Sequence, residues 1–196
     1  MPNQKENIMI KQALFISLFF FSSLVYAQDS DQIIHIDLDS DGKPDTVQLQ
    51  DNRLHIQLSS QKQPIIEPET ELDTLPATLR VVRVGFIETF AFPGGQSSYH
   101  FAYDKQSHQI QLIGIDIEYF PNRSLPNYGK GSLNLKTGNY IGKWTILNGK
   151  KNTIRTIPIQ TNLKITPVIL DANFERNSIA ASHKMYEIEE AHGIQH

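Results

Sequence analysis

Cysteine is absent from the 196-residue chain, which excludes a disulfide framework, a thiolate metal site and a lipid-modified cysteine. An excess of basic residues is also absent, because 18 lysines and arginines accompany 21 acidic residues and the formal net charge is -3. Nucleic-acid-binding domains usually carry a clustered basic surface, so we expect no nucleic-acid partner. The length favours one domain with an ample core, and the mean hydropathy of -0.34 is typical of a soluble protein.

Long apolar runs are missing except near the start of the chain. Residues 13–27 read ALFISLFFFSSLVYA, follow Lys11 and end in Val25-Tyr26-Ala27. A basic start, a short apolar centre and compact final residues predict a secretory signal peptide over residues 1–27, with cleavage after Ala27 and Met9 as an alternative start. The run is shorter than the roughly 20 residues of a membrane-spanning helix, which disfavours a membrane anchor. We therefore expect a periplasmic or secreted protein that is not associated with a membrane after cleavage.

Helical periodicity is scarce before residue 177, because apolar residues recur there at every second position. Such alternation is typical of half-buried strands. Turn residues separate the runs, so residues 28–176 are predicted to form one mainly β domain, an antiparallel β-sandwich or barrel of about nine strands. The predicted strands lie in residues 34–38, 47–49, 54–58, 79–92, 99–103, 110–119, 132–135, 140–147 and 153–159.

Three segments carry more specific structural predictions. Residues 61–76 are polar and contain proline, which predicts a connecting loop. Gly85, inside the long apolar run 79–92, predicts a bulge or a close approach of another backbone segment. Residues 177–196 are predicted to form a C-terminal helix and tail, with Ser178 as the N-cap.

The most specific motif is Asp-Leu-Asp-Ser-Asp-Gly-Lys-Pro-Asp at residues 37–45. Its acidic residues at positions 1, 3, 5 and 9 match the ligand spacing of a calcium loop. A calcium ion binds about six to eight oxygens, and Gly42 at position 6 permits the sharp turn that directs them inward. The predicted ligands are the carboxylates of Asp37, Asp39, Asp41 and Asp45 and the backbone carbonyl of Lys43. The alternative is an acidic β-turn that binds no ion.

This loop differs from an EF-hand in two respects. Position 12 is Gln48, where an EF-hand has a bidentate glutamate, and the flanking residues alternate like strands. The motif therefore resembles the strand–loop–strand calcium hairpins of FG-GAP and related extracellular repeats, in which the ninth-position aspartate, here Asp45, completes the ligand shell. Such a site on an exported protein most often stabilises a hairpin, so we expect a structural ion.

A second motif, Phe-Pro-Gly-Gly-Gln-Ser-Ser-Tyr at residues 92–99, lies between two strongly apolar runs. Glycines, small hydroxyl residues and a tyrosine predict a protruding loop that can enter a cleft. The alternative is an ordinary hairpin connection. The candidate target-binding residues are Gly95, Ser97, Ser98 and Tyr99.

The order of the motifs resembles a known family. The export signal, the calcium loop and GGQSSYHFAYD at residues 94–104 are followed by QLIGID at 111–116, SLNLKTG at 132–138 and LDANFE at 170–175. Together they look like periplasmic immunity proteins that neutralise lysozyme-like effectors and are similar in fold to invertebrate-type lysozyme inhibitors. The resemblance covers most of residues 33–175 and implies a calcium-bound inhibitor whose partner is a lysozyme-like muramidase. In those inhibitors a Ser-Gly-x-x-Tyr loop occludes the cleft, whereas here the serines follow the glycines.

Common enzyme motifs are missing, including His-Glu-x-x-His, a phosphate-binding glycine loop and Gly-x-Ser-x-Gly. Asp116 and Glu118 share one face of a predicted strand, so a paired-carboxylate glycosidase is formally possible, but cross-strand ion pairs explain such acids more simply. We therefore expect no enzyme activity and no catalytic residue.

The alternative function is a calcium-stabilised module that binds a glycan or another envelope component. Exposed aromatic rings would favour it, but Trp144, the single tryptophan, lies within an alternating run.

Overall fold

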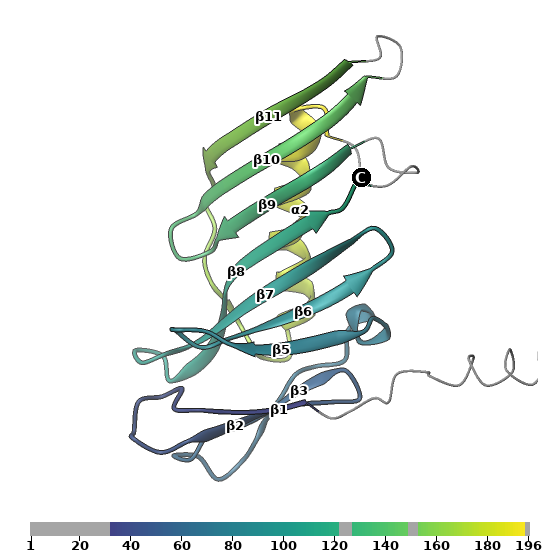
Figure 1. Ribbon diagram of the computed structural model, residues 1–196. Helices are drawn as coiled ribbons and strands as arrows, with labels where there is room; N and C mark the ends of the chain where they lie inside the picture. The colour runs from purple at the N-terminus through teal and green to yellow at the C-terminus, as the bar shows by residue number, and fades with distance from the viewer. Residues whose placement is uncertain (1–31, 122–126, 149–152, 195–196) are drawn as a thin grey trace, which may run out of the picture. The chain divides into compact units, whose positions relative to one another are not determined.

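The computed structural model describes residues 32–121, 127–148 and 153–194. The predicted signal peptide and its cleavage site after Ala27 lie outside these residues. The described chain is mainly β, with two antiparallel sheets and one C-terminal helix in a sandwich-like arrangement (Figure 1). This confirms the predicted fold class.

The smaller sheet contains four strands in the order β1-β2-β3-β4. They are β1 (Gln32–Ile36), β2 (Asp45–Gln50), β3 (Arg53–Gln57) and β4 (Ile65–Ile66). The register places Ile36 opposite Asp45, so the acidic loop is the connection between β1 and β2. Alternation along β2 and β3 buries Val47, Leu54 and Ile56 completely, as a period of two requires.

The larger sheet has the order β11-β10-β9-β8-β7-β6-β5, and β12 also pairs with β8. Its strands are β5 (Ala77–Val81), β6 (Phe86–Phe92), β7 (Gly95–Asp104), β8 (Gln109–Tyr119), β9 (Asn127–Asn134), β10 (Asn139–Asn148), β11 (Thr153–Asn162) and β12 (Val168–Ile169). Strands that follow one another in the chain are neighbours in this sheet from β5 to β11, which is the expected result of short antiparallel connections.

Helix α2 (Phe174–Ala191) lies along one face of the larger sheet (Figure 1). The prediction that Ser178 caps this helix is wrong, because the helix begins at Phe174 and the Ser178 hydroxyl donates to the Glu175 carbonyl at 2.9 Å. The physical reason is tertiary packing: the Phe174 ring is buried against Phe101, with centroids 5.8 Å apart. Burial of the Phe174 ring extends the N-terminal end of the helix by one turn, so that the helix begins before Ser178.

The described residues contain twelve strands where about nine were predicted. The predicted run 79–92 is two strands, β5 and β6, joined by a turn. The predicted connecting loop 61–76 contains β4 and a short 3-10 helix, η1 (Glu71–Thr74). Strand β12 lies in a segment for which no strand was predicted. Strands of two residues, such as β4 and β12, contain too few positions for any periodicity to be visible in the sequence.

Gly85 confirms the predicted close approach of another backbone segment, although it lies in the β5–β6 turn and not in a bulge. Its φ is +89°, and an added Cβ would lie 1.9 Å from the Phe101 carbonyl oxygen of β7. We expect Gly85→Ala to lower the free energy of unfolding by more than about 3 kcal/mol, because the substitution both strains the backbone and displaces β7. Urea denaturation measures this change. Gly193→Ala is the matched control, because Gly193 has φ +81° but nothing within 4 Å of the added Cβ. Equal losses in the two variants would contradict the steric explanation.

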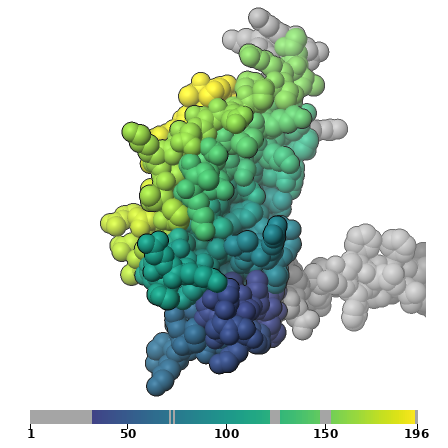
Figure 2. Space-filling view, turned by 90° about the vertical axis from the view of Figure 1, so that its left-hand side faces the viewer, coloured from purple at the N-terminus to yellow at the C-terminus, as the bar shows by residue number. Residues whose placement is uncertain are grey.

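The two sheets and the helix contribute to one hydrophobic core. It includes Leu58 from the connection after β3, Ile110 and Leu112 from β8, and Met185 from α2. In Figure 2 the purple and blue residues of the smaller sheet lie directly against the teal residues of the larger sheet. Gln32 of β1 also joins the two sheets, because its amide donates to the Ala77 carbonyl at 3.3 Å and accepts from the Leu79 N–H at 2.8 Å.

Candidate functional site

The acidic loop between β1 and β2 brings three of the predicted calcium ligands together. Carboxylate oxygens of Asp37, Asp39 and Asp45 all lie within 4.8 Å of one another. Gly42 has φ +85°, and its N–H donates to Asp37 Oδ2 at 3.1 Å, which closes the turn as the sequence predicts. Three convergent carboxylates are a suitable oxygen set for a hard divalent cation.

Asp41, the fourth predicted carboxylate, is not part of this group of three. Its Oδ2 accepts a hydrogen bond from the Ser59 hydroxyl at 2.8 Å, and its Oδ1 accepts from the Lys43 N–H at 2.8 Å. These two hydrogen bonds hold the pKa of Asp41 below its ordinary value, and the bond from Ser59 has the larger effect. A calcium ion bound by all four aspartates would therefore require the Asp41 carboxylate to move towards the other three. Lys43 itself takes part in the loop through its N–H.

Asp45 has a structural role that the ligand spacing did not indicate. Its side chain is buried, with 1% of the residue exposed. Its Oδ2 accepts from the Leu38 N–H and its Oδ1 from the Ser59 N–H, both at 2.7 Å. The Ser60 hydroxyl also donates to Asp39. Ser59 and Ser60 follow β3 and are far from the loop in sequence, so no local pattern could have identified them as its partners.

The second motif does not form the protruding loop that the sequence predicts. Residues 95–99 are the first half of β7, and the turn consists of Pro93 and Gly94 alone, as in an ordinary hairpin connection. The reason is pairing on both sides: β7 is bonded to β6 and to β8, so these residues lie inside the sheet. Gly95 is required there, because an added Cβ would lie 2.5 Å from the Glu118 carbonyl oxygen.

The candidate residues of β7 alternate between the two faces of the sheet. Ser97 and Tyr99 face helix α2, and Ser98 faces the opposite side. Tyr99 is only 5% exposed and packs edge-on against Phe90 at 5.6 Å. Burial raises the pKa of Tyr99 to about 12, although its hydrogen bond with the Ser182 hydroxyl acts in the opposite direction. Tyr99 therefore belongs to the core between sheet and helix, whereas Ser98 is accessible.

The face of the sheet opposite α2 is polar. His100 Nε2 lies 2.7 Å from Asp116 Oδ2, and the Gln96 amide donates to Glu118 at 3.0 Å. Burial alone would raise the pKa of Asp116, but hydrogen bonds from His100 and Ser132 outweigh it and the pKa is lowered. A glycosidase general acid requires a raised pKa, so Asp116 does not have the electrostatic property of that acid.

Trp144 is fully buried and donates its indole N–H to the Tyr140 hydroxyl at 3.0 Å. The Tyr140 hydroxyl in turn donates to Glu189 of α2. Burial raises the pKa of Tyr140, and the hydrogen bond to Glu189 raises it further. The Tyr119 hydroxyl donates to Tyr186, also on α2. These contacts attach the C-terminal half of the helix to β8 and β10. The single tryptophan is therefore part of the core and does not provide the exposed ring that a sugar-binding platform needs.

The described residues thus define a mainly β, sandwich-like protein with a helix-covered sheet and an acidic loop between two strands. Comparisons of the chain with protein-family models, curated proteins and solved structures gave no match. The only long helix in the described residues, α2, is not apolar enough to cross a membrane. The resemblance to immunity proteins therefore stays a prediction.

Proposed function

We propose that the chain is an exported calcium-binding inhibitor of a lysozyme-like peptidoglycan hydrolase, an immunity protein without catalytic activity. The observation that carries the proposal is the convergence of Asp37, Asp39 and Asp45 within the β1–β2 loop. This loop is the most specific element of the resemblance, and three of its four aspartate carboxylates lie close enough together to contact one cation. The partner and the periplasmic location follow from the resemblance and from the predicted signal peptide.

Calcium has a structural role in this proposal. The loop connects two strands and is hydrogen-bonded to Ser59 and Ser60 after β3, so an ion that orders the loop would also support its contact with that segment. The ion would supply positive charge that offsets the repulsion among the carboxylates.

We expect calcium to raise the melting temperature, because an ion that binds only the folded state stabilises it by mass action. At a hundredfold excess over the dissociation constant the gain is about 2.7 kcal/mol. Calorimetry of chelator-stripped protein should show one site, and magnesium serves as the control ion. An absence of both heat and thermal shift on calcium addition would rule out the site.

The contact element of the inhibitor is the tip of the β6–β7 hairpin together with Phe120. Pro93 is exposed at the turn, and the Phe120 N–H donates to the Gly94 carbonyl at 2.8 Å, which holds Phe120 beside the tip. Phe120 is 43% exposed, and behind it Phe92 and Tyr119 pack with centroids 5.6 Å apart. A rigid tip with an exposed aromatic ring can occlude a cleft without chemistry of its own, and such rings are frequent hot spots.

The test is inhibition of a panel of lysozyme-type muramidases by the mature protein. We expect Phe120→Ala to weaken inhibition at least tenfold, since loss of an aromatic hot spot typically costs about 2 kcal/mol. Ile33→Ala is the matched control, because Ile33 is also exposed, at 51%, but lies in β1 of the smaller sheet. Failure of the parent to slow any muramidase would count against the function. Binding to purified peptidoglycan without inhibition would favour the glycan-binding alternative.

A further inference from the structure

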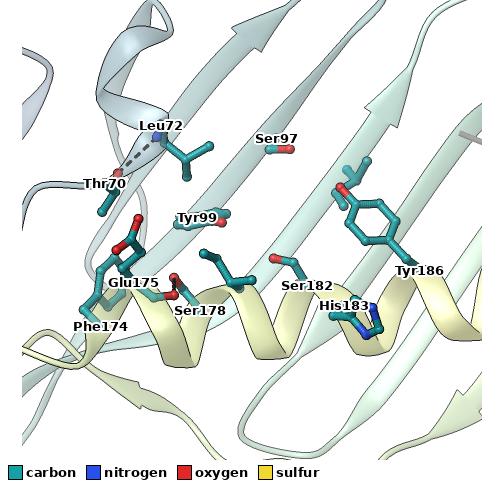
Figure 3. Close-up of a pocket in the computed structure, with 12 residues that line it drawn as sticks. Thr70, Leu72, Ser97, Tyr99, Phe174, Glu175, Ser178, Ser182, His183 and Tyr186 are labelled. Atoms are coloured by element: carbon teal, nitrogen blue, oxygen red, sulfur yellow. Dashed lines mark hydrogen bonds between the residues drawn. The ribbon is translucent and has the colours of Figure 1, made fainter.

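A cavity of about 220 Å³ lies between helix α2 and the larger sheet. Figure 3 shows Ser97 and Tyr99 of β7 on one wall and Ser178, Ser182 and Tyr186 of α2 on the other. The cavity is partly open to solvent, because Ile179 and His183 on its wall are exposed. A cavity of about 150 Å³ is enough to hold benzene when its walls are apolar.

The lining combines apolar surface with hydroxyl groups. Leu72, Ile117 and Phe174 supply aliphatic and aromatic walls. The Ser97 hydroxyl points into this space and has no hydrogen-bond partner among the described residues. A hydroxyl at this position can donate one hydrogen bond to a ligand and accept another.

Two of the residues that line the cavity, Glu175 and His183, can carry a charge. Among the residues that the structure describes, no lysine or arginine lines the cavity. His183 has a side chain that is 69% exposed and pairs with Glu187 at 3.3 Å. Glu175, the other charged lining residue, is at the N-terminal end of the helix. Ile117 and Phe174 are buried, so a charged group placed against them would lose its hydration, and this part of the cavity favours neutral ligands.

We infer that this cavity binds a small neutral ligand with an apolar ring and one hydroxyl group, the chemistry of a phenol or a cyclic alcohol. The ring fills the space between Ile117 and Phe174, and the hydroxyl of the ligand exchanges hydrogen bonds with Ser97. Entry is from the side of Ile179, which lines the cavity and is 53% exposed. This site is separate from the acidic loop and from the hairpin tip, so it does not depend on the proposed inhibitory function.

The experiment titrates the full mature protein with phenol and cyclohexanol, followed by calorimetry and by chemical-shift changes, with benzoate and benzylamine as charged controls. We expect saturable binding of the two neutral probes and none of the charged ones. Ser97→Leu should weaken phenol binding at least tenfold, because the larger side chain fills the cavity. Ser98→Leu is the matched control, because the neighbouring serine faces the opposite side of the sheet.

Ser182→Leu fills the same cavity from the helix side and decides the result if Ser97→Leu fails to fold. Absence of saturable binding by both neutral probes would overturn the inference. Undiminished binding in a folded cavity-filled variant, or equal binding of benzoate, would also overturn it. None of these outcomes bears on muramidase inhibition, so the two proposals fail independently.

Discussion

Replacement of Asp45 by alanine is expected to lower the free energy of unfolding by about 3 kcal/mol even when no calcium is present, because one buried and one partly buried backbone donor lose their acceptor. Asp45 is buried and accepts from the N–H groups of Leu38 and Ser59, both at 2.7 Å. Alanine provides no oxygen for either group. Urea denaturation in excess chelator measures the effect without any contribution from calcium.

Asp41→Ala is the matched control for this experiment. Asp41 belongs to the same motif, but its side chain is exposed and accepts from the Ser59 hydroxyl and the Lys43 N–H at the surface. We expect Asp41→Ala to leave stability in chelator nearly unchanged and to remove the calcium-dependent gain. If Asp45→Ala is as stable as the parent in chelator, then Asp45 is only a calcium ligand and the structural role assigned to it is wrong.

Tyr99→Ala is expected to destabilise the protein by about 3–5 kcal/mol, the usual range for removal of a large buried ring. Tyr99 is 5% exposed, packs against Phe90 and already borders the cavity beneath α2, so the truncation enlarges a void that its neighbours do not fill. Thermal and urea denaturation measure the loss. Tyr99→Phe keeps the ring and removes only the hydrogen bond with Ser182, so it should cost about 1 kcal/mol or less.

The same variants test whether Tyr99 contacts a muramidase. Below its melting temperature, Tyr99→Ala should inhibit as well as the parent, because the side chain faces the helix and not the solvent. Ser98→Ala is a useful companion, because Ser98 lies on the accessible face and bonds to Thr89 at 2.8 Å. A Tyr99→Ala protein that keeps the parent's stability but loses inhibition would show that the ring is a contact residue.

Several features of this protein follow from local sequence alone. Alternating apolar residues predicted the longer strands, because a period of two buries one face of a sheet whatever lies next to it. The spacing of four aspartates predicted that their carboxylates converge, and those of Asp37, Asp39 and Asp45 do so around the local turn at Gly42, whereas Asp41 is not part of the group. Gly85 indicated a close backbone approach because only glycine fits where a neighbouring chain lies that near.

Other features were decided by contacts between segments distant in the chain. Gly95, Ser97 and Ser98 were predicted to lie in a loop, but pairing of β7 with both β6 and β8 places them in a central strand. The same pairing directed Tyr99 towards the helix, and burial of Phe174 against Phe101 began that helix before Ser178. Ser59 bonds to the acidic loop only because β3 lies beside β2. Local propensity does not contain this information, because the free energy of burial depends on which surfaces the whole chain brings together.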